Sequence, residues 1–177
     1  MKKILLLMSL IPSIVFAQQY IPDSKETEIK FVVNNFGLGT NGSFQQLSGN
    51  INWDPKNLGI SSFQVSIDAT TIDTDNKLRD KHLRKEDYFG VQKFPTITLQ
   101  SSKISGNSNG TYQLEANLTI KGTTKKISFP FTAIQQGKNI IFKGTFEINR
   151  RDYAVGGASI SLSNTVKIKI NVSAVAQ

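Results

Sequence analysis

The segment FQVSIDA, residues 63–69, alternates strictly between apolar and polar side chains. In an extended chain successive side chains point to opposite sides, so its four apolar residues would share one face. This period of two predicts a β-strand with one buried and one solvent-facing side. The same pattern recurs on both sides of the segment. Seven further strands are expected at about residues 28–33, 43–53, 95–99, 112–120, 127–133, 140–148 and 165–176.

Eight amphipathic strands joined mostly by short turns define the fold class. Connections this short join only antiparallel neighbours. An open sheet of eight strands would leave two unpaired edges and a bare apolar face, and closure into a cylinder removes both. At ~3.3 Å per residue the longer strands reach ~35 Å, which favours a tall barrel. We therefore expect an all-β fold, an eight-stranded antiparallel up-and-down β-barrel, with a two-sheet sandwich as the structural alternative.

Four local features are expected to interrupt the regular pattern. Residues 20–23 are interpreted as a short lead-in, and the glycine-rich residues 37–42 as a turn region. Gly49 predicts a bend or bulge within the second strand. Pro130 lacks a backbone N–H, so we expect a bulge in the sixth strand.

The longest stretch without a strand pattern is residues 71–97, which follows the third strand. Asp75 or Asn76 is suited to cap the N-terminus of a helix, and Gly90 to end one. Loops inside β-domains are usually much shorter, and long ones often act as lids or binding loops. We predict a long, partly helical insert between strands 3 and 4 that covers one end of the barrel.

The N-terminus has the features of an export signal. Lys2 and Lys3 precede an apolar run over residues 4–16, and Ala17 suits a signal-peptidase site. We expect residues 1–17 to be a signal peptide cut after Ala17, residues 18–177 to form one domain, and the mature protein to be periplasmic or secreted. Cleavage would remove two lysines and no acid, lowering the formal charge from +8 to +6.

Composition argues against several classes of function. The basic residues are scattered and do not alternate with stacking aromatics, so we expect no nucleic-acid partner. The chain has no cysteine and one histidine, His82, which is thin material for a metal site. A hydrolase would have to use His82, but no Gly-x-Ser-x-Gly elbow is present. We expect no enzyme activity, no metal and no cofactor.

The inward face of the predicted barrel is apolar along its whole length. An eight-stranded barrel is near the size at which side chains just fill the bore or leave room for one small ligand. From the pattern alone, a tunnel and a filled core remain equally open. The residues predicted to line a tunnel are Phe31, Val33, Phe63, Val65, Ile67, Leu118, Phe129, Phe131, Phe142, Phe146 and Ile170. The mouth or lid is assigned to Arg79, Asp80, His82, Tyr88, Phe89 and Phe94.

Arg79 has two interpretations. Its guanidinium could pair with the phosphate or carboxylate of a ligand head group. Alternatively, Arg79 and Asp80 form an ion pair that pins the insert to the barrel, and the sequence favours this structural role. The same choice applies to Arg150, Arg151 and Asp152.

Across the whole mature chain the sequence resembles the YceI family of exported lipid- or polyisoprenoid-binding proteins. The matching blocks are Thr74, Asn76, residues 79–83, 87–89, 94–95, 118–125 and 146–150, with Asp152 and Tyr153. The resemblance implies a lipocalin-like barrel that holds a lipid tail in an apolar tunnel. Members differ in ligand, which can be an isoprenoid chain, a fatty acid or a fatty-acid amide.

We therefore expect a protein that sequesters or carries an isoprenoid or fatty-acyl chain without chemistry. The alternative is a structural or interaction module of the cell envelope with a filled core and no ligand. A transient contact with the membrane surface and a homodimer are both compatible with the sequence.

Overall fold

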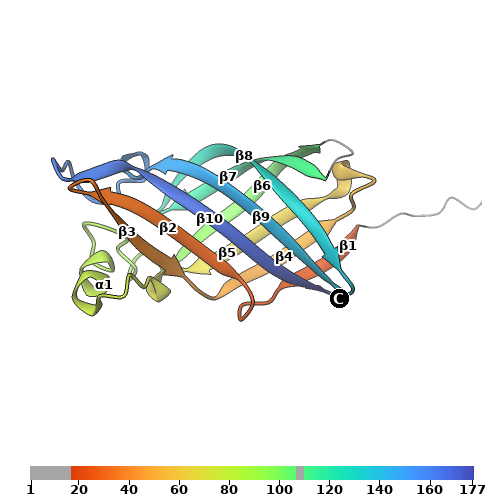
Figure 1. Cartoon of the computed structure of the whole chain (residues 1–177), viewed down its shortest axis with the longest axis horizontal. Coiled ribbons are helices and arrows are strands. Elements are labelled where there is room, and N and C mark those ends of the chain that lie inside the picture. Colours follow the sequence, from red (N-terminus) through yellow and green to blue (C-terminus); the bar gives the residue numbers. More distant parts are fainter. Residues whose placement is uncertain (1–16, 107–109) are drawn as a thin grey trace, which may run out of the picture.

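The computed structural model describes residues 17–106 and 110–177 and shows one elongated β-barrel (Figure 1). Of the predicted signal peptide, residues 1–16 lie outside the described residues. The strands are β1 (Gln18–Pro22), β2 (Glu28–Asn35), β3 (Leu38–Phe44), β4 (Leu47–Trp53), β5 (Ser62–Asp68), β6 (Thr96–Gly106), β7 (Thr111–Ile120), β8 (Thr123–Gln136), β9 (Asn139–Asn149) and β10 (Leu162–Ala176). The helices are α1 (Lys77–Leu83) and the 3₁₀-helices η1 (Leu58–Ile60), η2 (Ala69–Thr71) and η3 (Arg150–Tyr153).

Ten strand segments make a barrel of eight strands. β1 and β2 together make one strand of the barrel, because both pair with β10 and only a turn separates them. In the same way β3 and β4 are separated by residues 45–46 alone and pair with β2 and β1. All neighbours are antiparallel, and β1 closes the cylinder by pairing with both β4 and β10. The predicted eight-stranded antiparallel barrel is therefore confirmed.

Two segments differ from the sequence prediction. Residues 20–23, interpreted as a lead-in, belong largely to β1, and residues 37–42, interpreted as a turn region, belong largely to β3. Glycine and polar residues are tolerated in β3 because the ring of Phe31 lies across the strand: a Cβ on Gly42 would come within 2.2 Å of Phe31 Cζ. The large Phe31 side chain on β2 therefore requires glycine, which has no side chain, at position 42 of β3.

Gly49 and Pro130 behave differently from each other. Gly49 has a φ of 121°, and a Cβ there would lie 2.2 Å from the carbonyl oxygen of Gln64, so the position demands glycine, although the β4–β5 register passes through Gly49 and Val65 without a bulge. The bulge expected at Pro130 is wrong, because the β7–β8 register passes through Gln113 and Pro130 without a shift. Pairing of β8 with β9 begins only at Phe131, so the proline lies just beyond that ladder.

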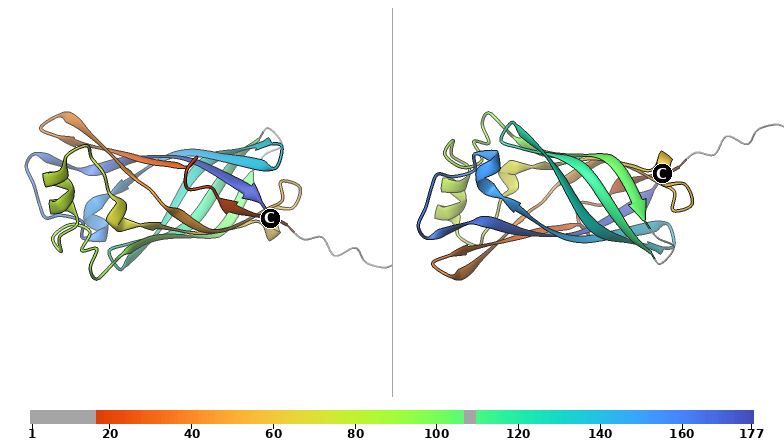
Figure 2. Two further views of the ribbon diagram at one scale, coloured as in Figure 1. Left: turned by 90° about the horizontal axis from the view of Figure 1, so that it is seen from below. Right: turned by 90° about the horizontal axis from the view of Figure 1, so that it is seen from above.

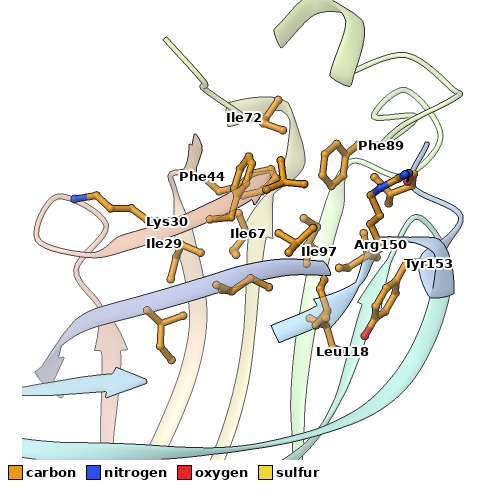
Figure 3. A pocket seen from close by; sticks show the side chains of 18 of the residues that line it. Ile29, Lys30, Phe44, Ile67, Ile72, Phe89, Ile97, Leu118, Arg150 and Tyr153 are labelled. Atoms are coloured by element: carbon orange, nitrogen blue, oxygen red, sulfur yellow. Dashed lines mark hydrogen bonds between the residues drawn. The ribbon is translucent and has the colours of Figure 1, made fainter. Parts of the chain in front are cut away.

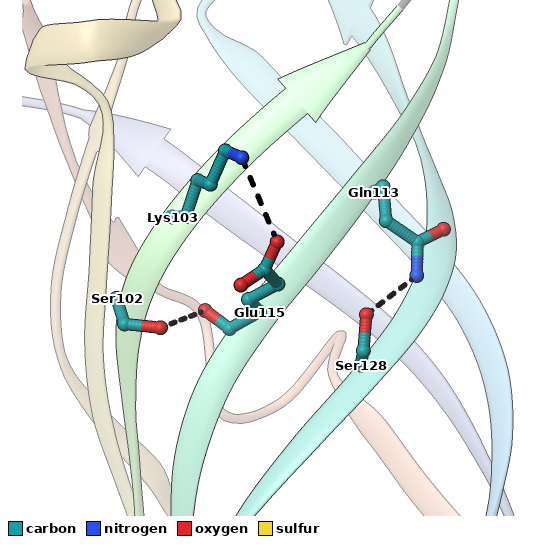
Figure 4. Close-up of polar contacts among 5 residues, drawn as sticks. All are labelled: Ser102, Lys103, Gln113, Glu115 and Ser128. Atoms are coloured by element: carbon teal, nitrogen blue, oxygen red, sulfur yellow. Dashed lines mark hydrogen bonds and ion pairs between the residues drawn. The ribbon is translucent and has the colours of Figure 1, made fainter.

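A bulge does occur in β6. Ser101 pairs with Ala116 and Lys103 with Glu115, which leaves Ser102 without a partner residue on β7. The hydroxyl of Ser102 donates to the Glu115 carbonyl at 3.1 Å, as Figure 4 shows, so the hydrogen bonding of the ladder continues through a side chain. Two more contacts lie on this outer face: the Lys103–Glu115 ion pair at 3.8 Å and a 2.8 Å hydrogen bond from Gln113 to Ser128.

The connection between β5 and β6, residues 69–95, is hereafter the insert. Its regular structure consists of η2 and the seven-residue helix α1, so helix makes up only a small part of the segment that was expected to be partly helical. Asn76 caps α1 by accepting a hydrogen bond from the Arg79 N–H at 3.0 Å. Beyond the helix the chain turns, with Gly90 at a φ of 56°. A bridge between Ser43 and Asp73 attaches the insert to β3.

Strand alternation divides the barrel wall into an inner and an outer side. On β10, Val166, Ile168 and Ile170 face the bore, whereas Lys167 and Lys169 are exposed. Within the described ranges, no helix is long and apolar enough to cross a membrane. The insert and the β2–β3 turn lie at one end of the barrel, and the C-terminus lies at the other (Figures 1 and 2).

Candidate functional site

A cavity of about 620 Å³ occupies the bore of the barrel and opens toward the insert. Its wall is made by inward-facing aliphatic and aromatic side chains from strands around the ring, and part of it is drawn in Figure 3. Cavities of this size are typical of small-molecule sites. The bore is therefore hollow at this end.

Five aromatic residues close the bore toward the other end. Trp53 packs edge-on against Tyr112, Phe131 and Phe142, with ring centroids 4.8, 5.8 and 5.4 Å apart. Phe63 completes the group, 5.1 Å from Phe142. Trp53 pairs with Gln18, the first residue of β1, and therefore lies near the end of the barrel away from the insert. Phe63, Phe131 and Phe142 also line the cavity, so the group forms its bottom, and we call the five residues the aromatic floor. The bore is packed at one end and open at the other.

All eleven residues predicted to line a tunnel do line the cavity. Three of them, Phe63, Phe131 and Phe142, belong to the floor and are almost completely buried. The other eight form the wall above it, where Phe129 and Phe146 stack at 4.2 Å. Whether they bind a ligand remains a prediction.

Four of the six predicted mouth residues line the cavity: Arg79, His82, Tyr88 and Phe89. Phe89 packs edge-on against Phe44 of β3 at 5.5 Å, which draws the insert over the opening. His82 packs edge-on against Tyr88 at 5.0 Å. The insert thus forms part of the cavity wall.

Asp80 and Phe94, the other two residues assigned to the mouth or lid, belong to the insert but do not line the cavity. Asp80 is buried, and its carboxylate accepts hydrogen bonds from the N–H and the hydroxyl of Thr74 at 2.9 and 2.6 Å. Phe94 packs outside the cavity on the β7–β8 turn, where a Cβ on Gly122 would lie 2.6 Å from its ring.

Arg79 and Asp80 also do not form the ion pair favoured by the sequence. The Nε and Nη2 groups of Arg79 donate to the Thr74 hydroxyl and carbonyl at 2.7 and 2.6 Å. Thr74 therefore joins the two charged residues through a chain of hydrogen bonds. The network fixes the start of α1 and leaves Arg79 exposed at the edge of the cavity.

Arg150 is a feature of the cavity that the sequence did not assign to it. Its side chain is 5% exposed and lines the cavity beside Tyr153 (Figure 3). Within the described residues no carboxylate lies within ion-pair distance of it, so the expected pairing with Asp152 is wrong. Its donors reach the Ser163, Val155, Gly157 and Leu162 carbonyls and the Asn164 amide oxygen at 2.9 to 3.3 Å.

Burial shifts the pKa of both Arg150 and Tyr153. Desolvation lowers the pKa of Arg150, and the neighbouring Arg151 lowers it further. Desolvation, helped by Asp152, raises the pKa of Tyr153 to about 12. Arg150 remains a cation at neutral pH, so the opening of an apolar cavity contains a buried positive charge without a partner anion among the described residues. An anionic group that approaches the opening would be attracted to it.

A metal site is not visible in residues 17–106 and 110–177, where no three His, Cys, Asp or Glu side chains are grouped closely enough to hold an ion. The donors that are present belong to backbone-anchoring networks. The cavity therefore presents apolar side chains together with the positive charges of Arg79 and Arg150.

Comparison with known proteins agrees with this geometry. The sequence profile of the YceI-like domain matches residues 20–174. The chain belongs to the YceI-like family. A UPF0312 protein of Vibrio cholerae serotype O1 is 30% identical, with 99% of both chains covered.

Solved structures of similar proteins have the same barrel. BcnA of Burkholderia cenocepacia has a TM-score of 0.82 at 26% identity, with 86% of this chain and 98% of BcnA covered. A polyisoprenoid-binding domain from Saccharophagus degradans, implicated in plant cell wall breakdown, has a TM-score of 0.72 and covers 89% of this chain and 98% of its own. At 16% sequence identity, this structural similarity shows a shared fold alone.

Further cavity residues of this YceI-like chain escaped the sequence prediction. Phe44, Ile72 and Leu114 line the cavity from β3, the insert and β7. Leu114 lies in phase with the predicted strand, so a complete list of in-phase positions would have found it. Phe44 and Ile72 lie at a strand end and in a loop, where periodicity carries no information about direction.

Proposed function

We propose that this YceI-like protein binds a lipid and sequesters or carries its isoprenoid or fatty-acyl chain in the barrel cavity. The observation that carries the proposal is the hollow, apolar bore above the aromatic floor. Each methylene transferred from water into such a cavity contributes about 0.8 kcal/mol. The ligand would be enclosed within the barrel, as in lipocalins.

The volume of the cavity sets the scale of the bound chain. At about 30 Å³ for each water-sized group, 620 Å³ accommodates roughly twenty methylene-sized groups. A chain of this length would run from the floor to the opening. A longer isoprenoid would extend past the insert.

The polar end of the ligand would lie at the opening, beside Arg79 and Arg150. Both cations border the cavity, and neither has a carboxylate partner among the described residues. They favour a phosphate or carboxylate head over a cationic one. The polyisoprenoid-binding domain of Saccharophagus degradans, which has the same fold, supports a long apolar tail as the common feature.

Binding would be reversible and would require neither a catalyst nor a cofactor. In the described part of the chain, the imidazole of His82 has no hydrogen bond to a carboxylate or a hydroxyl and instead packs on Tyr88. This arrangement gives no support to a His82-dependent hydrolase. We place the mature carrier in the periplasm or outside the cell, after cleavage at Ala17.

The test is a matched pair of tryptophan substitutions on β5. Val65 faces the cavity, whereas its neighbour Gln64 is exposed on the outer surface. Val65→Trp should fill part of the cavity and lower the affinity of the delipidated protein for palmitate and farnesol at least tenfold. Gln64→Trp should bind both as the unmodified protein does. Calorimetric titration measures the affinities, and circular dichroism verifies that both variants are folded.

Native mass spectrometry of freshly purified protein, followed by organic extraction, provides a second measurement. We expect a hydrophobic adduct in the unmodified protein and less of it in Val65→Trp. Equal affinities and equal adducts in both folded variants would exclude the cavity as the binding site. Absence of binding to either lipid in the unmodified protein would favour the envelope module without a ligand.

A further inference from the structure

Among the residues that the structure describes, four large apolar side chains are unusually exposed. Phe36, Leu38, Leu78 and Ile160 are exposed by 81, 75, 83 and 108% respectively. The other exposed large apolar residues, Ile21, Ile60 and Ile134, reach only 38 to 44%. Single exposed apolar residues are normal on protein surfaces, but a group of them marks an interaction site.

The four residues surround the opening of the cavity, although they come from three separate segments. Phe36 and Leu38 belong to the β2–β3 turn, Leu78 to α1, and Ile160 to the loop before β10. These three segments lie at the same end of the barrel in all views (Figures 1 and 2). The Phe36 N–H donates to the Ser161 carbonyl at 2.9 Å, and Leu78, Ser159 and Ser161 all line the cavity. We call the four residues the apolar rim.

Phe36 occupies a position that its backbone conformation disfavours. It has a φ of 51° and is followed by Gly37 with a φ of 77°, in a two-residue turn between the paired residues Asn35 and Leu38. Such turns favour Asn, Asp or Gly at the first position, and a bulky residue there is strained. An exposed phenylalanine gains no packing that would offset the strain. The turn is therefore better explained by an external contact than by folding.

The rim borders a cationic helix surface. Lys77, Arg79, Lys81 and Lys85 are exposed on α1 and the turn after it. Asp80 is the acid within this stretch, and its carboxylate is buried against Thr74. Acidic residues of the insert also reach solvent at Asp73, Asp75, Glu86 and Asp87, on either side of the helix. The exposed charges of α1 itself, next to Leu78, are therefore all positive.

We propose that the apolar rim and the cationic surface of α1 dock this end of the barrel on an anionic lipid bilayer. The rim residues enter the headgroup layer, while the lysines and Arg79 attract anionic headgroups. Docking in this orientation places the cavity opening against the lipid. A lipid tail then passes between bilayer and barrel without crossing water. This inference goes beyond the proposed carrier function, and it names the surface that faces the membrane.

The test measures binding of the delipidated mature protein to phosphatidylcholine vesicles with and without phosphatidylglycerol, by co-sedimentation. The rim variant is Phe36→Asn with Ile160→Ser, neither of which lines the cavity. We expect it to lose at least tenfold in affinity for the anionic vesicles. Its thermal midpoint should not fall, because Asn suits the backbone at position 36. The matched control is Ile21→Ser with Ile134→Ser, on β1 and β8, and should bind as the unmodified protein does.

Charge is tested separately with Lys77→Glu and Lys81→Glu together, against Lys167→Glu and Lys169→Glu on the outer face of β10. We expect only the α1 pair to weaken binding, and the loss to disappear on neutral vesicles. Palmitate affinity in vesicle-free solution should be unchanged in the rim variant, so failure of docking and failure of lipid binding are distinguishable. Unaltered vesicle binding in the rim variant would overturn the proposal. So would a dimer that the rim variant disrupts while no vesicle binding is seen, since the rim would then join two copies of the chain.

Discussion

Arg150 combines two roles that usually belong to different residues. Its side chain connects the end of β9 to the loop before β10, through carbonyls at Val155, Gly157 and Leu162 among others. The same guanidinium borders the cavity, and no carboxylate in the described part of the chain pairs with it. A buried charge without a counter-ion is costly, so hydrogen bonding to the loop must compensate for desolvation. The arrangement fixes the position of positive charge at the opening.

Arg150→Met should destabilise the fold by about 3 kcal/mol, because the buried acceptors of the loop lose their donors while the methionine fills most of the volume. Urea denaturation measures the loss. The exposed neighbour gives the control: Arg151→Met should change stability by less than about 0.5 kcal/mol.

Lipid binding separates the two roles of Arg150. If the charge contributes to recognition, folded Arg150→Met should lose affinity for palmitate and retain affinity for farnesol, which carries no charge. An equal loss for both lipids would mean that Arg150 acts only by shaping the loop.

At the scale of elements, the insert is held by side chains more than by regular structure. Arg84 donates to the Thr70 and Ile72 carbonyls at 2.8 and 2.7 Å, and Thr74 connects Arg79 with Asp80. The Gly156 N–H donates to the Asp87 carbonyl at 2.8 Å, which ties the insert to the loop after η3. A segment with one short helix can therefore hold a fixed position over the cavity.

Thr74→Val should loosen the insert and leave the barrel intact. The substitution preserves side-chain shape but removes the hydroxyl that joins Arg79 and Asp80, at a cost of about 1–3 kcal/mol. Hydrogen exchange should become faster at the backbone amides of residues 74–91 and stay unchanged in β7 to β10.

Thr145→Val, at an exposed position on β9, is the matched control and should leave both regions unaffected. Uniformly faster exchange throughout the barrel in Thr74→Val would show that the insert and barrel unfold as one unit.

The same scale shows how far alternation predicts structure. It identified the inward faces of β5, β7 and β10, where every second residue is apolar. It missed β3, because Gly42 makes room for the Phe31 ring and the strand has little apolar character of its own. The missing information is a contact between two strands, which no single segment contains. The Arg79–Asp80 pair failed for a similar reason, since Thr74 satisfies both residues.

At the scale of the whole molecule, the bore is filled by side chains at one end and hollow at the other. Both the filled-core and the tunnel interpretations of the inward face were therefore right for part of the bore. Alternation assigns Phe131 and Phe129 the same inward direction, yet Phe131 contacts Trp53 across the barrel and Phe129 stacks on Phe146 in the wall. Which of the two phenylalanines packs in the floor and which lies in the cavity wall depends on distances across the closed barrel, and the sequence of a single strand does not contain these distances.

Cavity depth should determine which chain lengths are distinguished. In a series of saturated fatty acids, affinity should increase by up to about 0.8 kcal/mol for each added methylene. The increase should stop at roughly twenty carbons, when the cavity of 620 Å³ is full. Competition against a fluorescent fatty acid measures the series.

Shallower penetration is the alternative outcome of the same series. If affinity stopped increasing at half this length, the chain would not reach the aromatic floor. The Phe142→Leu substitution, which enlarges the cavity at the floor, should then leave the limiting fatty-acid length unchanged. If the chain does reach the floor, the same substitution should increase the limiting length.

For the proposed lipid carrier, the aromatic floor also has a kinetic consequence. With the far end blocked by Trp53 and its neighbours, an incoming molecule has no route that pushes the resident one out from behind. Exchange is then strictly sequential: the occupant departs first, and the vacant barrel refills. The rate of replacement should equal the dissociation rate of the bound lipid and stay constant however much competitor is added. The protein alone then sets the residence time of the lipid.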